Sequence, residues 1–181
     1  MRLQLERRPS PIGVMLLVFD EESALRALDF EDYETRLSTL LRRHYGDIAL
    51  PEGDAPVAIT RALDAYFEGD LSALQKVRVA TNGSPFQREV WKALRMIPAG
   101  ATTSYGRLAA DLGRPAASRA VGLANGANPI AIVVPCHRVI GANGALTGYG
   151  GGLSRKRWLL DHERRFAAAA ESVLATARLA S

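Results

Sequence analysis

Cysteine is almost absent from this chain: there is one, Cys136, in 181 residues. A single cysteine excludes an internal disulfide, which agrees with a reducing compartment. The chain also has only three histidines, His44, His137 and His162. This donor set does not suit a structural zinc site, which takes four ligands and usually at least two thiolates. We therefore expect no metal ion, and the one thiol is free for other chemistry.

Long apolar runs are missing as well. No stretch approaches the roughly 18 residues that a membrane-spanning helix needs, and the first residues, MRLQLERRPSPIG, lack the apolar centre of a signal peptide. We expect no membrane partner and a cytoplasmic location. The composition, 48% hydrophobic and 23% charged, is ordinary for a globular protein. The length fits one large domain or two small ones.

Lysine is scarce, and charge is unevenly distributed. Only three of the 23 basic residues are lysines. Residues 1–80 have a net charge of −4, whereas residues 81–181 have a net charge of +8. A single arginine is most often a solvated residue on a helix face. The asymmetry as a whole nevertheless favours a polyanionic partner, nucleic acid, for the second half alone.

The first half reads as a small α+β unit. Residues 11–20 and 24–30 have the composition of two strands joined by an acidic turn. Residues 33–46 and 55–70 have helical spacing, and a glycine follows where each helix should stop. No residue cluster here indicates chemistry. We assign residues 1–80 to an N-terminal α/β support domain.

The second half, residues 81–165, is predicted to be a DNA-binding domain. Ser84, Pro85 and Gln87 form a helix start with a capping box. Two short apolar-striped segments, 105–112 and 115–124, are separated by Gly-Arg-Pro, which is the shape of a helix-turn-helix. An ordinary αα-hairpin fits the spacing equally well. The second segment is rich in small residues and carries one long cation, which favours the minor groove over base-specific reading.

The only thiol lies in the segment IAIVVPCHRVIGANG, residues 130–144. The apolar run predicts a buried strand that delivers Cys136 to its end. A free cysteine is most often a small buried hydrophobe, but Pro135 before it and His137 and Arg138 after it are unusual company for an inert thiol. Only the thiolate is a strong nucleophile, so an ionised, reachable Cys136 beside an imidazole is the reactive form. Glu163 is our candidate to orient His137, with Asp161 and Asp111 as alternatives.

The end of the chain contains a glycine-rich loop and a helix that we expect Ser154 to cap. The loop, residues 148–152, lacks the Lys-Ser/Thr pair of a nucleotide-phosphate loop, so no cofactor is expected. The tail, residues 166–181, has high helix propensity and no evident anchor, and is predicted to be helical or disordered.

Together the motifs carry a family resemblance. PCHRVIG (135–141), NP (128–129), SYGRLA (104–109), SRAVGLANG (118–126), FQREVWKAL (86–94) and GYGGG (148–152) resemble the methylated-DNA–protein-cysteine methyltransferases, the O6-alkylguanine-DNA alkyltransferases. The similarity runs in register from Phe86 to Glu163 and is looser before it. It implies an N-terminal ribonuclease-H-like domain and a C-terminal winged-helix-like domain that is both the DNA-binding and the alkyl-acceptor domain.

The resemblance also implies a role for each matching residue. Cys136 would accept the alkyl group, His137 would act as base through a water, and Glu163 would hold His137. Asn128 would join the recognition helix to the site, Arg119 would fill the place of the flipped nucleotide, and Tyr105 would rotate a phosphate and help protonate guanine. The implied DNA-binding residues are Arg119, Tyr105, Ala120, Gly122, Ala117 and Arg107. The implied base pocket is made of Tyr149, Gly150, Gly151, Val139, Ala131 and Pro135.

Two pocket positions depart from the mammalian pattern: Ala131 replaces a proline and Gly150 replaces a serine. These changes bear on tolerance for bulky adducts and leave the chemistry untouched. The mammalian zinc cysteines are also absent.

The expected activity is stoichiometric, irreversible transfer of an alkyl group from O6 of guanine in double-stranded DNA to Cys136, with transfer from O4 of thymine left open. The base would be flipped from the minor groove by a protein that acts as a monomer, with cooperative loading left open. Two alternatives remain: a thiol hydrolase using Cys136, His137 and Glu163, and a non-enzymatic helix-turn-helix regulator.

Overall fold

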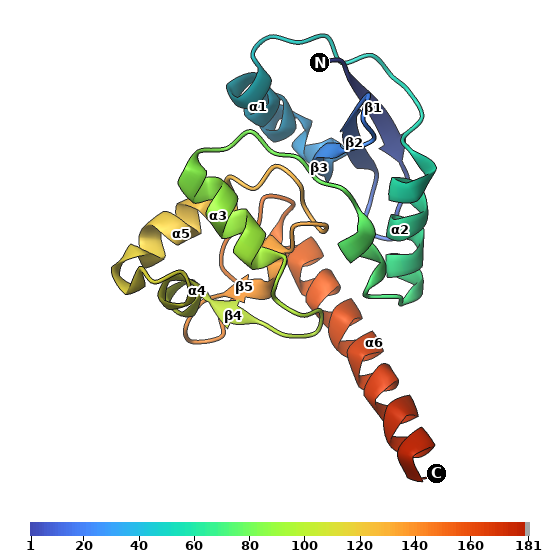
Figure 1. Ribbon diagram of the computed structural model, residues 1–181, viewed down its shortest axis with the longest axis vertical. Helices are drawn as coiled ribbons and strands as arrows, with labels where there is room; N and C mark the ends of the chain where they lie inside the picture. Colours follow the sequence, from blue (N-terminus) through green and yellow to red (C-terminus); the bar gives the residue numbers. More distant parts are fainter. Residues whose placement is uncertain (180–181) are drawn as a thin grey trace.

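The first half of the chain folds as a three-stranded antiparallel sheet flanked by two helices (Figure 1). The computed structural model describes residues 1–179. The strands lie in the order β1-β2-β3, and the elements are β1 (Leu3–Arg8), β2 (Met15–Asp20), β3 (Leu25–Phe30), α1 (Glu34–Tyr45) and α2 (Val57–Glu68). The two predicted strands and two predicted helices are confirmed. β1 was not predicted, because its charged residues hide the alternation of apolar and polar positions.

Both faces of this sheet are covered, which explains the uninterrupted apolar run of β2. Leu16 and Val18 pack with Leu37 and Leu41 of α1 on one face. Leu17 and its neighbours on the other face belong to the main core, which includes residues of α2. A strand buried on both faces needs apolar side chains at every position rather than at alternate ones.

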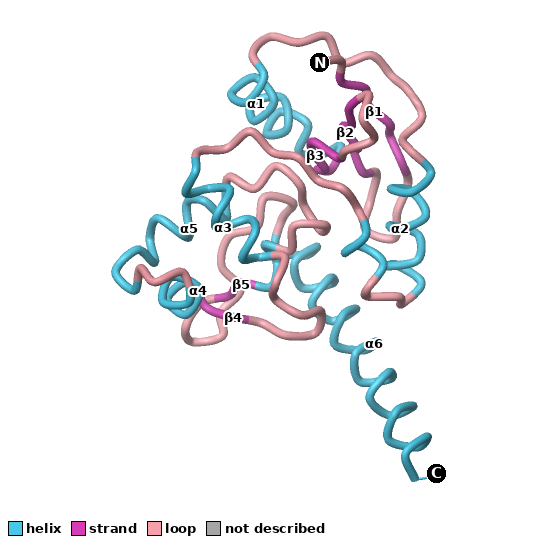
Figure 2. The backbone as a smooth tube through the Cα atoms, viewed as in Figure 1, coloured by secondary structure: helices cyan, strands magenta, loops and turns pink. Residues whose placement is uncertain are grey.

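The second half is mainly helical and contains a short two-stranded sheet (Figure 2). Its elements are α3 (Pro85–Leu94), β4 (Thr103–Ser104), α4 (Tyr105–Asp111), α5 (Ser118–Gly126), β5 (Val139–Ile140) and α6 (Leu153–Leu179). The predicted capping box is present, with Ser84 and Gln87 bonding each other's backbone N–H. A 3₁₀ turn, Pro115–Ala117, precedes α5, so the α-helix begins three residues later than predicted.

The run that leads to the cysteine does not form the predicted strand. Ile130 makes one isolated parallel bridge with Leu28 of β3, and the chain then turns through Ile132, whose φ is 65°. The side chain of Asn128 closes this turn: Nδ2 donates to Val134 O at 2.8 Å and Oδ1 accepts from Ile130 N at 3.0 Å. An apolar run fits a buried turn as well as a buried strand when a side chain supplies the missing backbone partners.

The last helix, α6, begins at Leu153, so Ser154 lies inside it and the predicted Ser154 cap is wrong. Its first part packs on the body of the protein, and its last part extends away from it (Figure 1). The tail, for which a helix or disorder was expected, belongs to this helix through Leu179, and residues 180–181 lie outside the described part. Among the described residues, no helix is long and apolar enough to cross a membrane.

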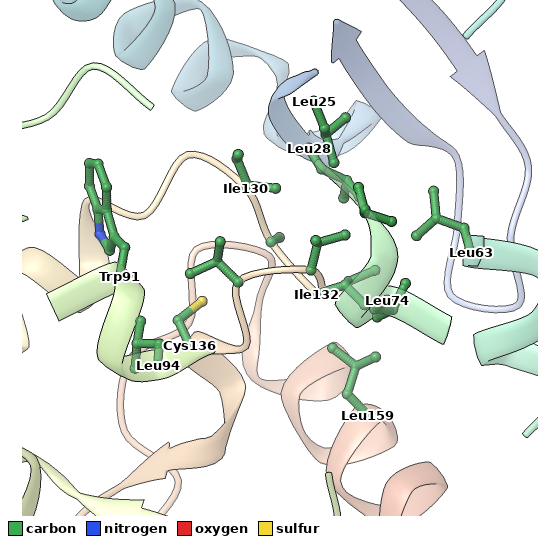
Figure 3. Packing of buried hydrophobic residues seen from close by; sticks show 14 of the residues in the cluster. Leu25, Leu28, Leu63, Leu74, Trp91, Leu94, Ile130, Ile132, Cys136 and Leu159 are labelled. Carbon is green, nitrogen blue, oxygen red and sulfur yellow. The ribbon is translucent and has the colours of Figure 1, made fainter. Parts of the chain in front are cut away.

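One core joins the two halves (Figure 3). Leu28 and Leu63 from the first half belong to the same buried cluster as Ile130, Ile132 and Leu159 from the second. Cys136 lies in this cluster as well. The site around the cysteine is therefore built on the region where the two halves meet.

Candidate active site

Cys136 begins a single 3₁₀ turn, Cys136–Arg138, directly after the buried turn at Ile132. The residue is only 6% exposed, and it is a free cysteine. Burial raises the pKa of its thiol, and a hydrogen bond from Asn128 only partly offsets this effect. The surroundings therefore favour the neutral thiol until a base removes its proton.

His137 and Glu163 form the predicted pair. His137 Nε2 lies 2.7 Å from Glu163 Oε1, and both side chains are wholly buried. Burial by itself raises the pKa of Glu163, but His137 and Arg138 outweigh it and hold that pKa well below its usual value. The carboxylate is therefore ionised and can only accept, so Nε2 carries the proton and Nδ1 holds a lone pair. Nδ1 is buried and has no hydrogen-bond partner among the described residues.

The two alternative acids lie elsewhere. Asp161 pairs with Arg164 and Asp111 pairs with Arg107, both on the surface. Spacing along α6 explains the choice, since Lys156, Leu159, Leu160 and Glu163 follow at i, i+3, i+4 and i+7 and are all buried. Glu163 thus faces inward, whereas Asp161 is on the opposite side.

Two arginines, Arg138 and Arg36, stabilise the site, and neither was predicted to be a site residue. Arg138 binds Glu163 through Nε at 2.9 Å and through a terminal nitrogen at 2.8 Å. Arg36 of α1 pairs with buried Asp29 and donates to the backbone oxygens of Gly126 (2.9 Å) and Asn128 (3.0 Å). The first half of the chain therefore contacts the segment that joins α5 to the cysteine turn.

The predicted DNA-binding residues lie on α4 and α5 and the 3₁₀ turn between them. Arg119 and Ala120 are exposed on α5, while Ala117 and Gly122 are half-buried. Tyr105, the first residue of α4, is half-buried, and its hydroxyl is 3.5 Å from Thr147 O. The remaining residue, Arg107, is exposed and forms an ion pair with Asp111. Val121 and Ala124 of α5 are buried, so one face of this helix packs and the other is open.

The predicted pocket residues belong to the cysteine segment and to the glycine-rich loop. The ring of Tyr149 meets that of His137 edge-on, with centroids 6.4 Å apart, and its hydroxyl is buried without a hydrogen-bond partner among the described residues. A side chain at Gly150 would overlap Arg36, and one at Gly151 would lie 2.8 Å from Phe30. The other three pocket residues, Ala131, Pro135 and Val139, are buried.

Lys156 is a further group that was not predicted. It is wholly buried, and its ammonium donates to the backbone oxygens of Val139 (2.6 Å) and Thr147 (2.8 Å). These hydrogen bonds link α6 to Val139 and Thr147, and so fix the loop between β5 and α6, which contains Tyr149. The sequence signal that could have predicted its burial is its helical spacing from Leu159 and Glu163 on the inward face of α6.

These features define a class: a pair of short helices with the shape of a helix-turn-helix, connected to a buried thiol, imidazole and carboxylate. Two family models match the chain, the ribonuclease-like domain of 6-O-methylguanine DNA methyltransferase over residues 8–81 and the DNA binding domain of the same family over residues 85–165. The chain belongs to the 6-O-methylguanine DNA methyltransferase family. The predicted family and mixed α/β fold class are confirmed.

Individual proteins that are similar to this chain have names that agree with this family. The methylated-DNA–protein-cysteine methyltransferase of Salmonella typhimurium is 53% identical over 165 residues, which cover 90% of this chain and 96% of the relative. That of Methanosarcina acetivorans is 47% identical over 154 residues, which cover 85% and 94%. A Mycobacterium tuberculosis O6-methylguanine methyltransferase crystal structure superposes with a TM-score of 0.73 at 43% identity, covering 91% of this chain and 94% of that one. The M. tuberculosis OGT in complex with DNA gives 0.75 at 44%, covering 92% and 94%.

Proposed function

We propose that this protein repairs DNA by moving an alkyl group from O6 of guanine to Cys136. The observation that carries this proposal is the free Nδ1 lone pair of His137, a base held by Glu163 and directly adjacent in sequence to the only thiol. The DNA-binding family domain and the relative's complex with DNA support double-stranded DNA as the partner. Family membership does not favour the thiol hydrolase or the non-enzymatic regulator.

The reaction begins with the proton of the thiol. His137 accepts this proton at Nδ1 through a water, and Glu163 stabilises the imidazolium that forms. The thiolate sulfur then attacks the alkyl carbon, so the S–C bond forms while the C–O6 bond breaks. The electron pair of the broken bond stays on guanine, which receives a proton in return. Thiol and alkylguanine thus become thioether and guanine.

This reaction occurs once per molecule. A thioether has no acidic proton and is a poor leaving group, and the chain has no second thiol to remove the alkyl group. We therefore infer a single turnover and a permanently alkylated product. We also infer a monomer that acts in the cytoplasm.

The target base must leave the duplex to reach a buried sulfur. Base flipping costs a few kcal/mol, and Arg119 on the exposed face of α5 is the side chain that takes the place of the base. Small residues beside it, Ala117, Ala120 and Gly122, allow close approach to the minor groove. Arg107 contributes a phosphate contact. Tyr105 rotates the neighbouring phosphate and helps to return a proton to guanine.

The flipped base is held near Tyr149, with Gly150, Gly151, Val139, Ala131 and Pro135 around it. Gly150 packs against Arg36 so closely that a larger residue there would displace the arginine. Asn128 keeps the cysteine turn fixed relative to α5 through its hydrogen bonds to the backbone of Ile130 and Val134.

A transfer assay with labelled O6-methylguanine and O6-benzylguanine duplexes tests the proposal. The wild-type protein should take up one label per chain from the methyl duplex. The Cys136→Ser variant should take up none while still binding the duplex. Release of the alkyl group as a free product with continuing turnover would refute alkyl transfer and favour the hydrolase.

A further inference from the structure

Tyr66 of α2 reaches across to the acid of the site. It is wholly buried, and its hydroxyl donates to Glu163 Oε1 at 2.8 Å. Its backbone oxygen is 2.8 Å from His162 Nε2, and the two rings are in contact with centroids 5.1 Å apart. Tyr66 is thus fixed against α6 by both its backbone and its ring. Its position is set by packing, and the hydroxyl is held at the carboxylate.

The oxygen that Tyr66 binds is crowded. Three donors converge on Glu163 Oε1: His137 Nε2 at 2.7 Å, Arg138 at 2.8 Å and Tyr66 at 2.8 Å. Oε2 receives two, from Arg138 Nε at 2.9 Å and Gly100 N at 3.2 Å. A carboxylate has about two lone-pair sites per oxygen, so the three donors on Oε1 share its electron density. Any donor that is removed leaves more of that density to the other two.

We propose that Tyr66 is a positioning residue that limits the basicity of His137 by competing for Glu163 Oε1. This inference rests on the proposed function, in which His137 takes the proton of Cys136. Arg138 holds the carboxylate from both oxygens, so Glu163 stays in place without Tyr66. The hydroxyl therefore sets the strength of the His137–Glu163 bond rather than its existence. Tyr66 belongs to the first half of the chain, so this half influences how readily His137 takes the proton of the Cys136 thiol.

The hydroxyl stays protonated under all ordinary conditions. Burial, followed by the charge of Glu163, raises the pKa of Tyr66 well above its usual value of 10.0. Burial also lowers the pKa of His137, and Glu163 opposes this. The polar and charged groups around His137 are Glu163 and Lys156 of α6, Arg138 and Cys136 of its own turn, and Tyr149 of the glycine-rich loop. Removing the Tyr66 hydroxyl leaves each of these groups in the chain, and only Glu163 loses a hydrogen bond.

The test is the titration of His137 in the Tyr66→Phe variant of the full chain. Phenylalanine keeps the ring that packs on Phe67 and His162. Because Oε1 then binds the imidazole N–H more strongly, we expect the pKa of His137 to rise by about 0.5–1 unit, the equivalent of one hydrogen bond. The measurement is the imidazole ¹⁵N shift as a function of pH, which is practical with three histidines.

Tyr45→Phe is the matched control. This tyrosine also bonds a charged side chain, Arg26, but at a distance from the site, and its removal should leave the His137 titration unchanged. Tyr66→Met, a second variant without the hydroxyl, should shift His137 in the same direction as Tyr66→Phe. The rate of Cys136 alkylation by iodoacetamide at pH 7 should rise about three- to tenfold in both Tyr66 variants.

A His137 pKa that is unchanged or lower in folded Tyr66→Phe would overturn the proposal, as would an unchanged alkylation rate. Thermal unfolding establishes that each variant is folded. None of these readouts uses DNA, so they can fail while alkyl transfer from DNA succeeds. The reverse is also true, and the two proposals are therefore tested separately.

Discussion

At the scale of single residues, the site depends on the carboxylate of Glu163. It is wholly buried and receives hydrogen bonds from His137, Arg138, Tyr66 and the backbone of Gly100. Removing one partner of a buried charged pair leaves the other uncompensated, at a cost of about 3–5 kcal/mol. The Glu163 carboxylate therefore contributes both to the stability of the folded protein and to the orientation of the His137 imidazole.

The Glu163→Gln variant should show both effects. We expect it to lose about 3 kcal/mol of unfolding free energy and to transfer alkyl groups at least about a hundredfold more slowly, since His137 loses its anionic acceptor. Urea unfolding and single-turnover transfer rates measure the two quantities. Glu22→Gln, at an exposed ion pair with Arg78, is the control and should change neither. A fully active Glu163→Gln would contradict the role of the carboxylate.

The same residue predicts a pH dependence. The pKa of Glu163 in the folded protein lies well below its usual 4.5, so its stabilising effect is present above pH 4.5 and is lost as the pH falls below that value. The difference in unfolding free energy between wild type and Glu163→Gln should therefore narrow between about pH 4.5 and 3. A difference that stays constant over this interval would mean that the carboxylate titrates normally.

At the scale of elements, α5 has one buried and one open face. Val121, Ala124 and Asn125 pack inward, while Arg119 and Leu123, one turn apart, point outward, and Leu123 is 73% exposed. A leucine exposed beside Arg119, the residue proposed to replace the flipped base, is suited to contact the minor groove, where proteins commonly place apolar side chains. This face is the one that approaches DNA in the proposed mechanism.

A carboxylate on this face should repel DNA. We expect Leu123→Glu to weaken duplex binding at least about fivefold, the effect of ~1 kcal/mol of charge repulsion near a phosphate. Val57→Glu places the same charge at a residue of α2 that is 60% exposed, and should bind like the wild type. Fluorescence anisotropy at fixed salt compares the two variants. Equal losses in both would mean that only net charge matters.

Local sequence patterns predicted the helices and the central strands well, because capping residues and apolar spacing act over a few positions. Ser84 and Gln87, for example, specify the start of α3 by direct contact. Residues 130–134 were misread because their turn depends on the side chain of Asn128, which replaces strand partners. An apolar run predicts that a segment is buried, but it does not predict which groups form hydrogen bonds with the backbone of that segment.

At the scale of the whole molecule, the halves meet where α2 and α6 pack. Gly69 ends α2 with φ of 112°, and an added Cβ would overlap the ring of Phe166. Gly46 ends α1 with φ of 76° and has open space around it. Both glycines have a positive φ that an L side chain rarely adopts, with ψ of −163° at Gly46 and −1° at Gly69, and only Gly69 has the close neighbour.

This pair separates backbone strain from crowding between the halves. Gly46→Ala should lose about 1–2 kcal/mol of unfolding free energy from strain alone. Gly69→Ala should lose at least ~1 kcal/mol more, since Phe166 must also move. Thermal or urea unfolding gives both values. Equal losses would mean that the contact between α2 and Phe166 adapts without cost.

Contacts between the halves are also what the sequence could not predict. Cys136 and His137 stood out in one local segment, and Glu163 was the candidate that the family resemblance favoured. Tyr66 is 97 residues away from Glu163, and Arg36 is 92 residues away from the Asn128 carbonyl it binds, and neither stands in a local pattern. The first half was assigned only a supporting role, yet it supplies a hydrogen bond to the acid of the site.

The most direct measurement is mass spectrometry of the protein after incubation with excess O6-methylguanine duplex. The account predicts one added methyl group per chain, located on the Cys136 peptide, with an equal amount of restored guanine in the DNA. Restoration of more guanine than there are protein molecules, or a methyl group on any other residue, would contradict it.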